Sequence, residues 1–142
     1  MHRHADEESR LLRTALQATA NAIVITDTQG RITWVNPAFT RFTGYTPEEV
    51  IGKNPRLLKS GQQDPAFYRN LWETVLAGQV WHGELINRRK DGSWYIEEQT
   101  ITPVRDERGK ITHFIAIKQD VTARRRAEAG LRLLAEASGE LS

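Results

Sequence analysis

The residues best suited to catalysis or metal binding are few and scattered in this 142-residue sequence. Of the four histidines, His2 and His4 lie at the amino terminus, whereas His82 and His113 fall in separate strand-like segments. None has a carboxylate at the spacing that a metal site needs. Glu97 and Glu98 are adjacent, and adjacent residues of a strand point to opposite faces. We therefore predict no catalytic residues and no metal site.

Reactive cysteine and the common catalytic motifs are absent as well. The sequence contains no cysteine, which excludes disulfides, thiolate nucleophiles, zinc ribbons and iron–sulfur clusters. It also contains no G-x-S-x-G, Walker or G-x-G-x-x-G string. These absences favour a binding or signalling module over an enzyme.

The composition is that of an ordinary globular domain, with 39% hydrophobic and 27% charged residues. Twenty basic residues against 18 acidic ones leave a net charge of only +2, which argues against wholesale binding of nucleic acid. The sequence contains no run of 18 apolar residues, the length needed to span a membrane, and its polar start does not resemble a signal peptide. We expect a cytoplasmic protein that does not insert into membranes.

Hydrophobic periodicity and turn residues predict the elements that must position any site. Asn36-Pro37 and Asp64-Pro65 combine an N-cap with proline at the first helical position, and Asp91-Gly92 indicates a hairpin. The predicted strands are 22–27, 31–35, 81–90, 93–104 and 110–121, and the predicted helices are 5–19, 37–43, 46–52, 64–77 and a last one from 122 onward. The order favours an α+β fold, with an antiparallel sheet and helices on one face.

The two terminal helices would flank a central domain. We predict a flanking helix in residues 1–20, a domain in 21–122 and a signalling helix in 123–142. The apolar stripe of the first helix, around Leu12 and Leu16, fits either a surface helix packed on the domain or a dimerising helix.

The last helix has apolar residues at alternating spacings of three and four, which is typical of a coiled coil. This seam has Ala127, Leu131, Leu134 and Leu141 at four of its positions and the polar Arg124 and Ser138 at the other two. We expect the helix to continue in a longer parent protein and to pair with a second copy. The alternative is a helix that folds back onto its own domain.

A set of strings in this order resembles the PAS domain family over residues 15–122. The strings include Val35-Asn36-Pro37-Ala38-Phe39, Thr43-Gly44-Tyr45, Arg89-Lys90-Asp91-Gly92 and the closing Asp120-Val121-Thr122. The resemblance implies a five-stranded antiparallel sheet with a cavity between its inner face and short helices. It also implies a sensory and dimerisation module and assigns Asp120-Val121-Thr122 as the signal exit, where Thr122 could cap the following helix.

Three further strings are similar to a narrower group that includes flavin-binding redox sensors. They are Asn54-Pro55-Arg56-Leu57-Leu58, Trp81-His82-Gly83-Glu84-Leu85 and Asn87-Arg88-Arg89-Lys90-Asp91-Gly92. Many proteins with these strings have no established ligand, so FAD is one candidate and the cofactor stays unknown. The reactive cysteine of the similar blue-light LOV domains would fall at Pro55, so adduct photochemistry is excluded. The resemblance offers no haem ligand either, because the helix over 64–77 contains no histidine.

Strand alternation then divides the side chains between the two faces of the sheet. In a LOV-like alignment Asn87 faces the cavity, which places the following residues on the same side: Leu85, Arg89, Tyr95, Glu97, Gln99, Ile101, Phe114, Ala116 and Lys118. The opposite face carries Ile86, Trp94, Ile96, Ile115 and Ile117 and needs a cover, either the first helix or a second subunit.

The candidate ligand-binding residues are Asn54, Trp81, Asn87, Glu97, Gln99 and Lys118. Each also has a structural interpretation. Glu97 and Lys118 could pair with each other or reach the rim, Trp81 could be a core aromatic residue, and Asn54 could cap a loop. Glu97 and Lys118 replace the amides of LOV domains, which weakens the resemblance to a flavin site. The basic run Arg88-Arg89-Lys90 is expected to be a solvated face.

The resemblance implies a sensory module of a bacterial signalling protein, most plausibly a sensor histidine kinase. It would sense a small molecule or cofactor in its cavity and relay the state through a homodimeric C-terminal helix to an output domain. Two alternatives stay open. One is a ligand-free dimerisation spacer, and the other is an FAD-binding redox sensor, which could lie upstream of a diguanylate cyclase.

Overall fold

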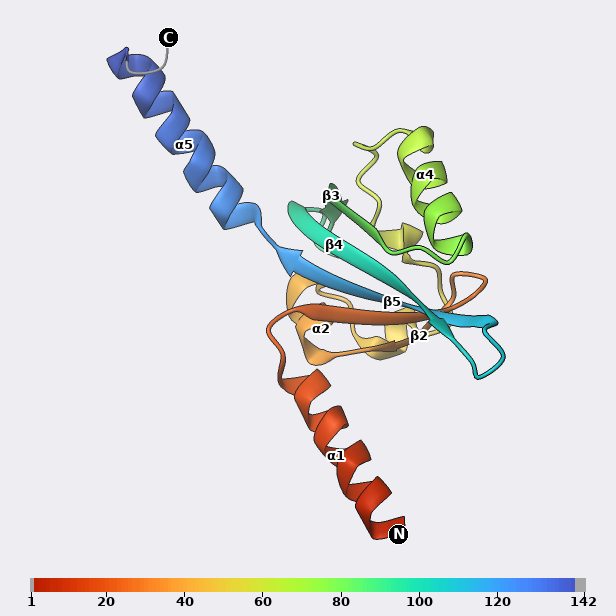
Figure 1. Cartoon of the computed structure of the whole chain (residues 1–142). Helices are drawn as coiled ribbons and strands as arrows, with labels where there is room; N and C mark the ends of the chain where they lie inside the picture. Colours follow the sequence, from red (N-terminus) through yellow and green to blue (C-terminus); the bar gives the residue numbers. More distant parts are fainter. Residues whose placement is uncertain (1, 140–142) are drawn as a thin grey trace.

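The computed structural model describes residues 2–139 of the chain (Figure 1). Its elements, in chain order, are α1 (His2–Ala18), β1 (Ala22–Asp27), β2 (Ile32–Val35), α2 (Pro37–Thr43), α3 (Pro47–Val50), the 3₁₀ helix η1 (Pro55–Leu58), α4 (Pro65–Leu76), β3 (Trp81–Arg88), β4 (Trp94–Arg105), β5 (Ile111–Asp120) and α5 (Thr122–Ser138). The predicted element order is confirmed.

The five strands form one antiparallel sheet in the order β2-β1-β5-β4-β3. The first hairpin therefore lies beside the last strand of the chain, with Val24 opposite Ala116. On the other side of β5, Gln99 of β4 lies opposite Lys118. The predicted α+β fold, with its antiparallel sheet, is confirmed.

Helices α2, α3 and α4 cover one face of this sheet, which we call the inner face. Their starts are set by the capping residues expected from the sequence. Asn36 accepts a hydrogen bond from the backbone of Phe39, and Asp64 accepts one from Phe67. Asn36 is fully buried and also accepts a hydrogen bond from the backbone of Ile23, so it joins α2 to β1. The core lies between these helices and the sheet and includes Val24, Ile32, Phe39, Val50, Leu58, Val75 and Phe114.

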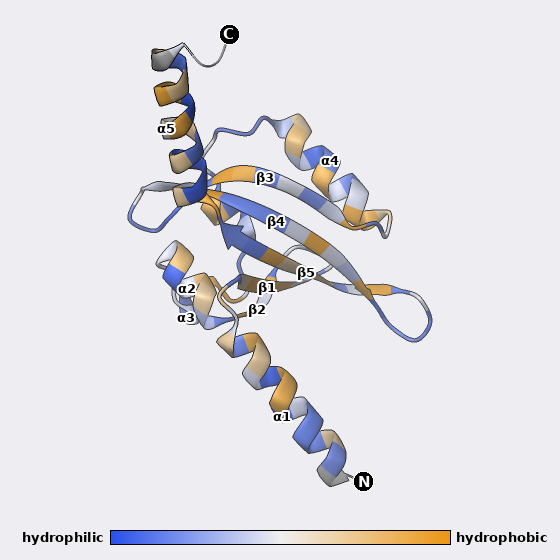
Figure 2. Cartoon of the chain, turned by 60° about the vertical axis from the view of Figure 1, so that its left-hand side comes forward, coloured by the Kyte–Doolittle hydropathy of each residue, from blue (hydrophilic) through white to orange (hydrophobic). Residues whose placement is uncertain are grey.

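The terminal helices α1 and α5 project away from the domain in opposite directions (Figures 1 and 2). Side chains 4–18 of α1 are all exposed, so the interpretation of this segment as a packed surface helix is wrong. α5 likewise does not fold back onto the sheet, because Leu131 and Leu134 are about two-thirds exposed. Both helices present hydrophobic residues to solvent within a single chain (Figure 2).

The outer face of the sheet lacks a cover in this single chain. Trp94 is 50% exposed and Ile117 is 44% exposed, while Ile86, Ile96 and Ile115 are half-buried. α1 points away from this face, so the first of the two expected covers, the N-terminal helix, is not used. A second subunit remains the expected cover.

Candidate functional site

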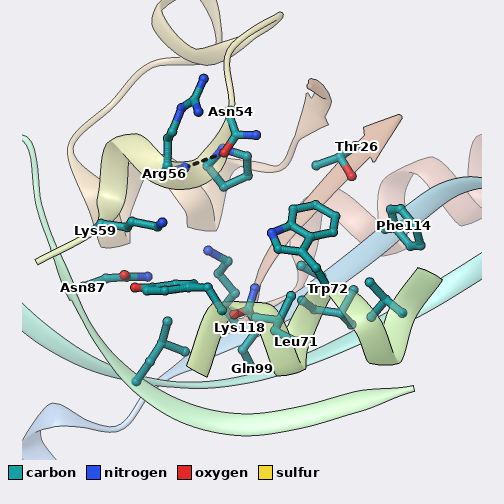
Figure 3. A pocket seen from close by; sticks show the side chains of 16 residues that line it. Thr26, Asn54, Arg56, Lys59, Leu71, Trp72, Asn87, Gln99, Phe114 and Lys118 are labelled. Atoms are coloured by element: carbon teal, nitrogen blue, oxygen red, sulfur yellow. Dashed lines mark hydrogen bonds between the residues drawn. The ribbon is translucent and has the colours of Figure 1, made fainter. Parts of the chain in front are cut away.

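A cavity of about 200 Å³ lies between the inner face of the sheet and the helices. Its lining residues come from all layers of the fold (Figure 3): Thr26, Asn54, Pro55, Arg56, Lys59, Tyr68, Leu71, Trp72, Val75, Leu85, Asn87, Gln99, Ile101, Phe114, Ala116 and Lys118. The residues of β3, β4 and β5 in this list are all among those that alternation assigned to the inner face, and β1 adds Thr26. Pro55, at the position of the LOV cysteine, also lines the cavity.

Beneath the cavity, Glu97 organises a cluster of buried polar groups. The carboxylate oxygen Oε1 accepts hydrogen bonds from Asn87 Nδ2, at 2.5 Å, and from Tyr95 Oη, at 3.1 Å. The other oxygen, Oε2, lies 3.6 Å from Lys118 Nζ. Glu97 is fully buried and Lys118 is 3% exposed, so this is the buried pair expected as one of two outcomes.

Tyr95 supports the carboxylate as a hydrogen-bond donor. Burial, reinforced by the neighbouring Glu97 charge, raises the pKa of Tyr95, so its hydroxyl stays protonated. A protonated phenol can donate to Glu97 Oε1, whereas a phenolate could not. The sequence analysis placed Tyr95 on this face but did not include it among the site residues.

Two polar groups of the sheet retain hydrogen-bonding capacity toward the cavity. The ion pair with Glu97 is longer than a hydrogen bond, and within residues 2–139 Lys118 Nζ makes no hydrogen bond. The Gln99 side chain, which lies opposite Lys118 in the sheet, also makes none in this part of the chain. Both side chains line the cavity and are more than 90% buried.

The helices add residues that the sequence analysis did not select. The ammonium of Lys59 lies 3.9 Å from the centre of the Tyr68 ring at the rim, and Trp72 packs edge-on against Phe114. Tyr68 and Trp72 lie four residues apart on α4, a spacing that places both on one side of the helix. This spacing could have indicated the two residues from the sequence. Whether they face the cavity depends on how α4 lies on the sheet.

Two of the predicted site residues have structural roles. Trp81 is buried against Phe67, with ring centres 5.6 Å apart, and belongs to the core rather than to the cavity lining. Asn54 does line the cavity, and its side chain also accepts a hydrogen bond from the backbone of Arg56 at the start of η1. Both interpretations offered for Asn54 are therefore compatible with the structure.

A series of polar contacts leads from the buried cluster around Glu97 to α5. The guanidinium of Arg89 lies 4.6 Å from the ring centre of Tyr95 and pairs with Asp120 at 3.2 Å. Asp120 Oδ1 accepts hydrogen bonds from the backbone and the hydroxyl of Thr122, at 3.0 and 2.6 Å. Arg89 therefore lies with the inner-face residues, as alternation predicted, and is not part of the solvated face expected for the basic run.

The start of α5 also differs from the expected cap. Thr122 is the first residue of the helix, and Val121 rather than Thr122 occupies the N-cap position. The Thr122 hydroxyl accepts a hydrogen bond from the backbone of Ile96 on β4 at 2.8 Å. The buried Val121 bonds to the same residue, so the exit motif fixes the first turn of α5 to the sheet.

The cavity is the feature of the described residues that could hold a ligand. Residues 2–139 contain no group of three or more His, Asp or Glu side chains that could hold a metal ion. In the same range, no helix combines the length and apolar character needed to cross a bilayer. The cavity instead offers hydrogen-bonding groups at one end and aromatic surface at the other.

Comparison with known sequences finds relatives for most of the chain. A family profile described as "PAS domain" matches residues 20–123. The nitrogen fixation regulatory protein of Klebsiella pneumoniae is 38% identical over 122 residues, which cover 86% of this chain and 25% of that protein. The blue-light-activated histidine kinase 1 of Erythrobacter litoralis is 34% identical over 92% of this chain and 38% of the kinase. The chain thus spans well under half the length of these curated relatives.

Solved structures give the same fold. An RNA-binding light-oxygen-voltage receptor matches with a TM-score of 0.80 and 30% identity, over 93% of this chain and 38% of the receptor. A PAS domain of a protein from Colwellia psychrerythraea matches with a TM-score of 0.70 and 26% identity, over 80% of this chain and 97% of that domain.

Proposed function

Because the chain belongs to the PAS domain family, whose members are sensory modules, we propose that residues 21–122 sense a small molecule in the cavity and pass its presence to α5. The flanking segments 1–20 and 123–142 would then connect the sensor to its neighbours. Histidine kinases among the relatives support an output domain of that class in the parent protein.

The observation that carries this proposal is a series of contacts between the cavity and α5, made of an ion pair, hydrogen bonds and a cation–ring contact. Lys118 lines the cavity and pairs with Glu97, and Glu97 bonds to Tyr95. Arg89 then contacts both the Tyr95 ring and Asp120, which holds the first residue of α5. A ligand that changes the position of Lys118 therefore acts on a group already linked to the start of α5.

A second copy of the chain is the proposed partner. Ala127, Leu131 and Leu134 of the seam are exposed on α5, and Leu141 lies outside the described residues. The outer face of the sheet and the stripe on α1 are also exposed and apolar. Dimerisation along these surfaces would bury them and bring the two α5 helices together.

Flavin binding is a second candidate function, and it is favoured by two features. Asn87 and Gln99 place amide groups on the cavity lining, and relatives include blue-light-activated histidine kinases. Against it stands the cavity volume of about 200 Å³, which is below the about 300–1,000 Å³ of typical ligand pockets. The ion pair of Glu97 and Lys118 also differs from a set of neutral amides.

Native mass spectrometry and absorption spectroscopy of the purified chain test the sensory role, together with thermal unfolding against a metabolite library. We expect a co-purifying small molecule or a compound that raises the Tm by about 5 °C at a hundredfold excess over its Kd. Ala116→Leu, which fills the cavity, should abolish the effect, whereas Ala66→Leu on the exposed start of α4 should not.

The spectra and the unfolding data also separate the alternatives. A flavin absorption band would establish the redox- or light-sensing candidate. A colourless protein without a bound mass, whose Tm no compound shifts, would contradict cavity sensing and leave a ligand-free dimerisation module.

A further inference from the structure

The lining of the cavity is strongly asymmetric in charge. It includes the three cationic side chains of Arg56, Lys59 and Lys118 but no aspartate or glutamate. In Figure 3 the guanidinium of Arg56 points away from the cavity, whereas Lys59 and Lys118 lie at the same end of it. One acid, Glu97, lies beneath the lining, and its Oε1 is already shared by two hydrogen-bond donors.

Lys118 is placed to bind an anionic group. Its ammonium is almost fully buried, and 3.6 Å separates it from Glu97 Oε2, which leaves its N–H donors available to a ligand. Gln99 lies opposite Lys118 in the sheet and presents an unused amide to the same space. Hydrogen bonds from an ammonium to a carboxylate are about twice as strong as those between neutral groups.

Lys59 adds a second positive charge at the rim of the same end. Its backbone forms a β-bridge with Asn87, so the position of the residue is fixed relative to β3. Its ammonium rests on the Tyr68 ring, which keeps the charge beside the cavity entrance.

The opposite end of the cavity is aromatic and aliphatic. Trp72 and Phe114 meet edge-on there. The apolar residues Val75, Ile101 and Ala116 also belong to the lining of the cavity. A flat or branched apolar group would fill this end and displace water from apolar surface. The small volume restricts the ligand to a compact molecule.

The geometry points to a small monocarboxylate with an aromatic or branched apolar body as the ligand. Its carboxylate accepts hydrogen bonds from Lys118 Nζ and from the amide of Gln99, with Lys59 adding charge at the rim, and its body packs against Trp72 and Phe114. This inference rests on the proposed sensory role of the cavity and names the ligand class.

Paired acids and amides test the charge requirement on the whole chain. The probes are benzoate, phenylacetate and isovalerate, each compared with benzamide, phenylacetamide or isovaleramide by calorimetry at constant ionic strength. At least one acid should bind, and its amide should bind about tenfold more weakly or not at all. If an amide binds as tightly as its acid, the carboxylate inference is wrong and the sensory role stands.

Variants assign the effect to the named residues. Lys59→Gln should weaken acid binding several-fold. The double variant Glu97→Gln/Lys118→Met should weaken acid binding about tenfold or more. It neutralises the lysine and its buried partner together, so no unpaired charge is left. Lys110→Gln, in the exposed turn after β4, is the matched control and should bind normally. Unchanged binding in the double variant would overturn the assignment to Lys118.

The failures of the two proposals are distinguishable. If none of the acids binds while FAD or an uncharged compound does, the ligand class is wrong and the cavity is still a sensor. If no probe or library compound binds at all, both proposals fail.

Discussion

Lys118→Met alone is expected to lower the free energy of unfolding by about 3–5 kcal/mol, because it leaves the buried Glu97 carboxylate without its cation. Glu97 Oε2 already accepts no hydrogen bond among the described residues, so nothing nearby can replace the lost charge. Chemical denaturation monitored by tryptophan fluorescence measures the loss.

The double variant Glu97→Gln/Lys118→Met should recover much of this stability. Glutamine keeps an oxygen that can accept from Asn87 and Tyr95, and it carries no charge that needs a partner. The control Lys110→Met, at an exposed position, should change the stability by no more than about 0.5 kcal/mol. A loss this small in Lys118→Met itself would show that the pair does not have the buried environment described.

Leu131→Asp combined with Leu134→Asp is expected to weaken dimerisation by at least about a hundredfold. Both leucines belong to the seam of α5 and are exposed in one chain, so a parallel pair of helices would bury them. The two substitutions would place four carboxylates in that interface, where unpaired charges are strongly unfavourable. Sedimentation equilibrium at micromolar concentrations measures the change.

Leu133→Asp is the matched control for this experiment. Leu133 is 66% exposed, close to the exposure of Leu131 and Leu134, but it lies off the seam. A dimer that persists in Leu133→Asp and dissociates in the double variant would support the seam. A wild-type chain that stays monomeric, or a control that dissociates equally, would contradict it.

Strand alternation, combined with the resemblance to LOV domains, was sufficient for the inner face of the sheet. Once Asn87 was assigned to the cavity side, alternation placed Glu97, Gln99 and Lys118 beside it, because side chains in a strand alternate with a period of two. Turn signals such as Asp91-Gly92 kept the register between strands predictable.

The helical side of the cavity could not be placed in the same way. Tyr68 and Trp72 form a visible stripe on α4, but the stripe points into the cavity only because of the angle at which α4 crosses β3 and β4. Trp81 was predicted either to contact a ligand or to be a core aromatic residue, and it packs on Phe67 in the core. Tertiary packing decides these positions.

The same limit applies to charged residues. The basic run Arg88-Arg89-Lys90 predicted a solvated Arg89, whereas alternation placed Arg89 on the inner face without indicating its partners. The ring of Tyr95 and the carboxylate of Asp120 come from strands β4 and β5 and meet Arg89 only in the folded sheet. The separation of these residues in the sequence does not predict such a contact.

The central claim is that the state of the cavity is passed to α5, and electron spin resonance between two labelled copies tests it most directly. The chain has no cysteine, so Arg132→Cys on the exposed side of α5 provides a single labelling site. The distance between labels is compared in two backgrounds, the otherwise unchanged chain and the Glu97→Gln/Lys118→Met variant. The account predicts that the distance distribution shifts by about 1–2 Å or more, and that Asp120→Asn removes the shift. Identical distributions in the two backgrounds would contradict transmission from the cavity to α5.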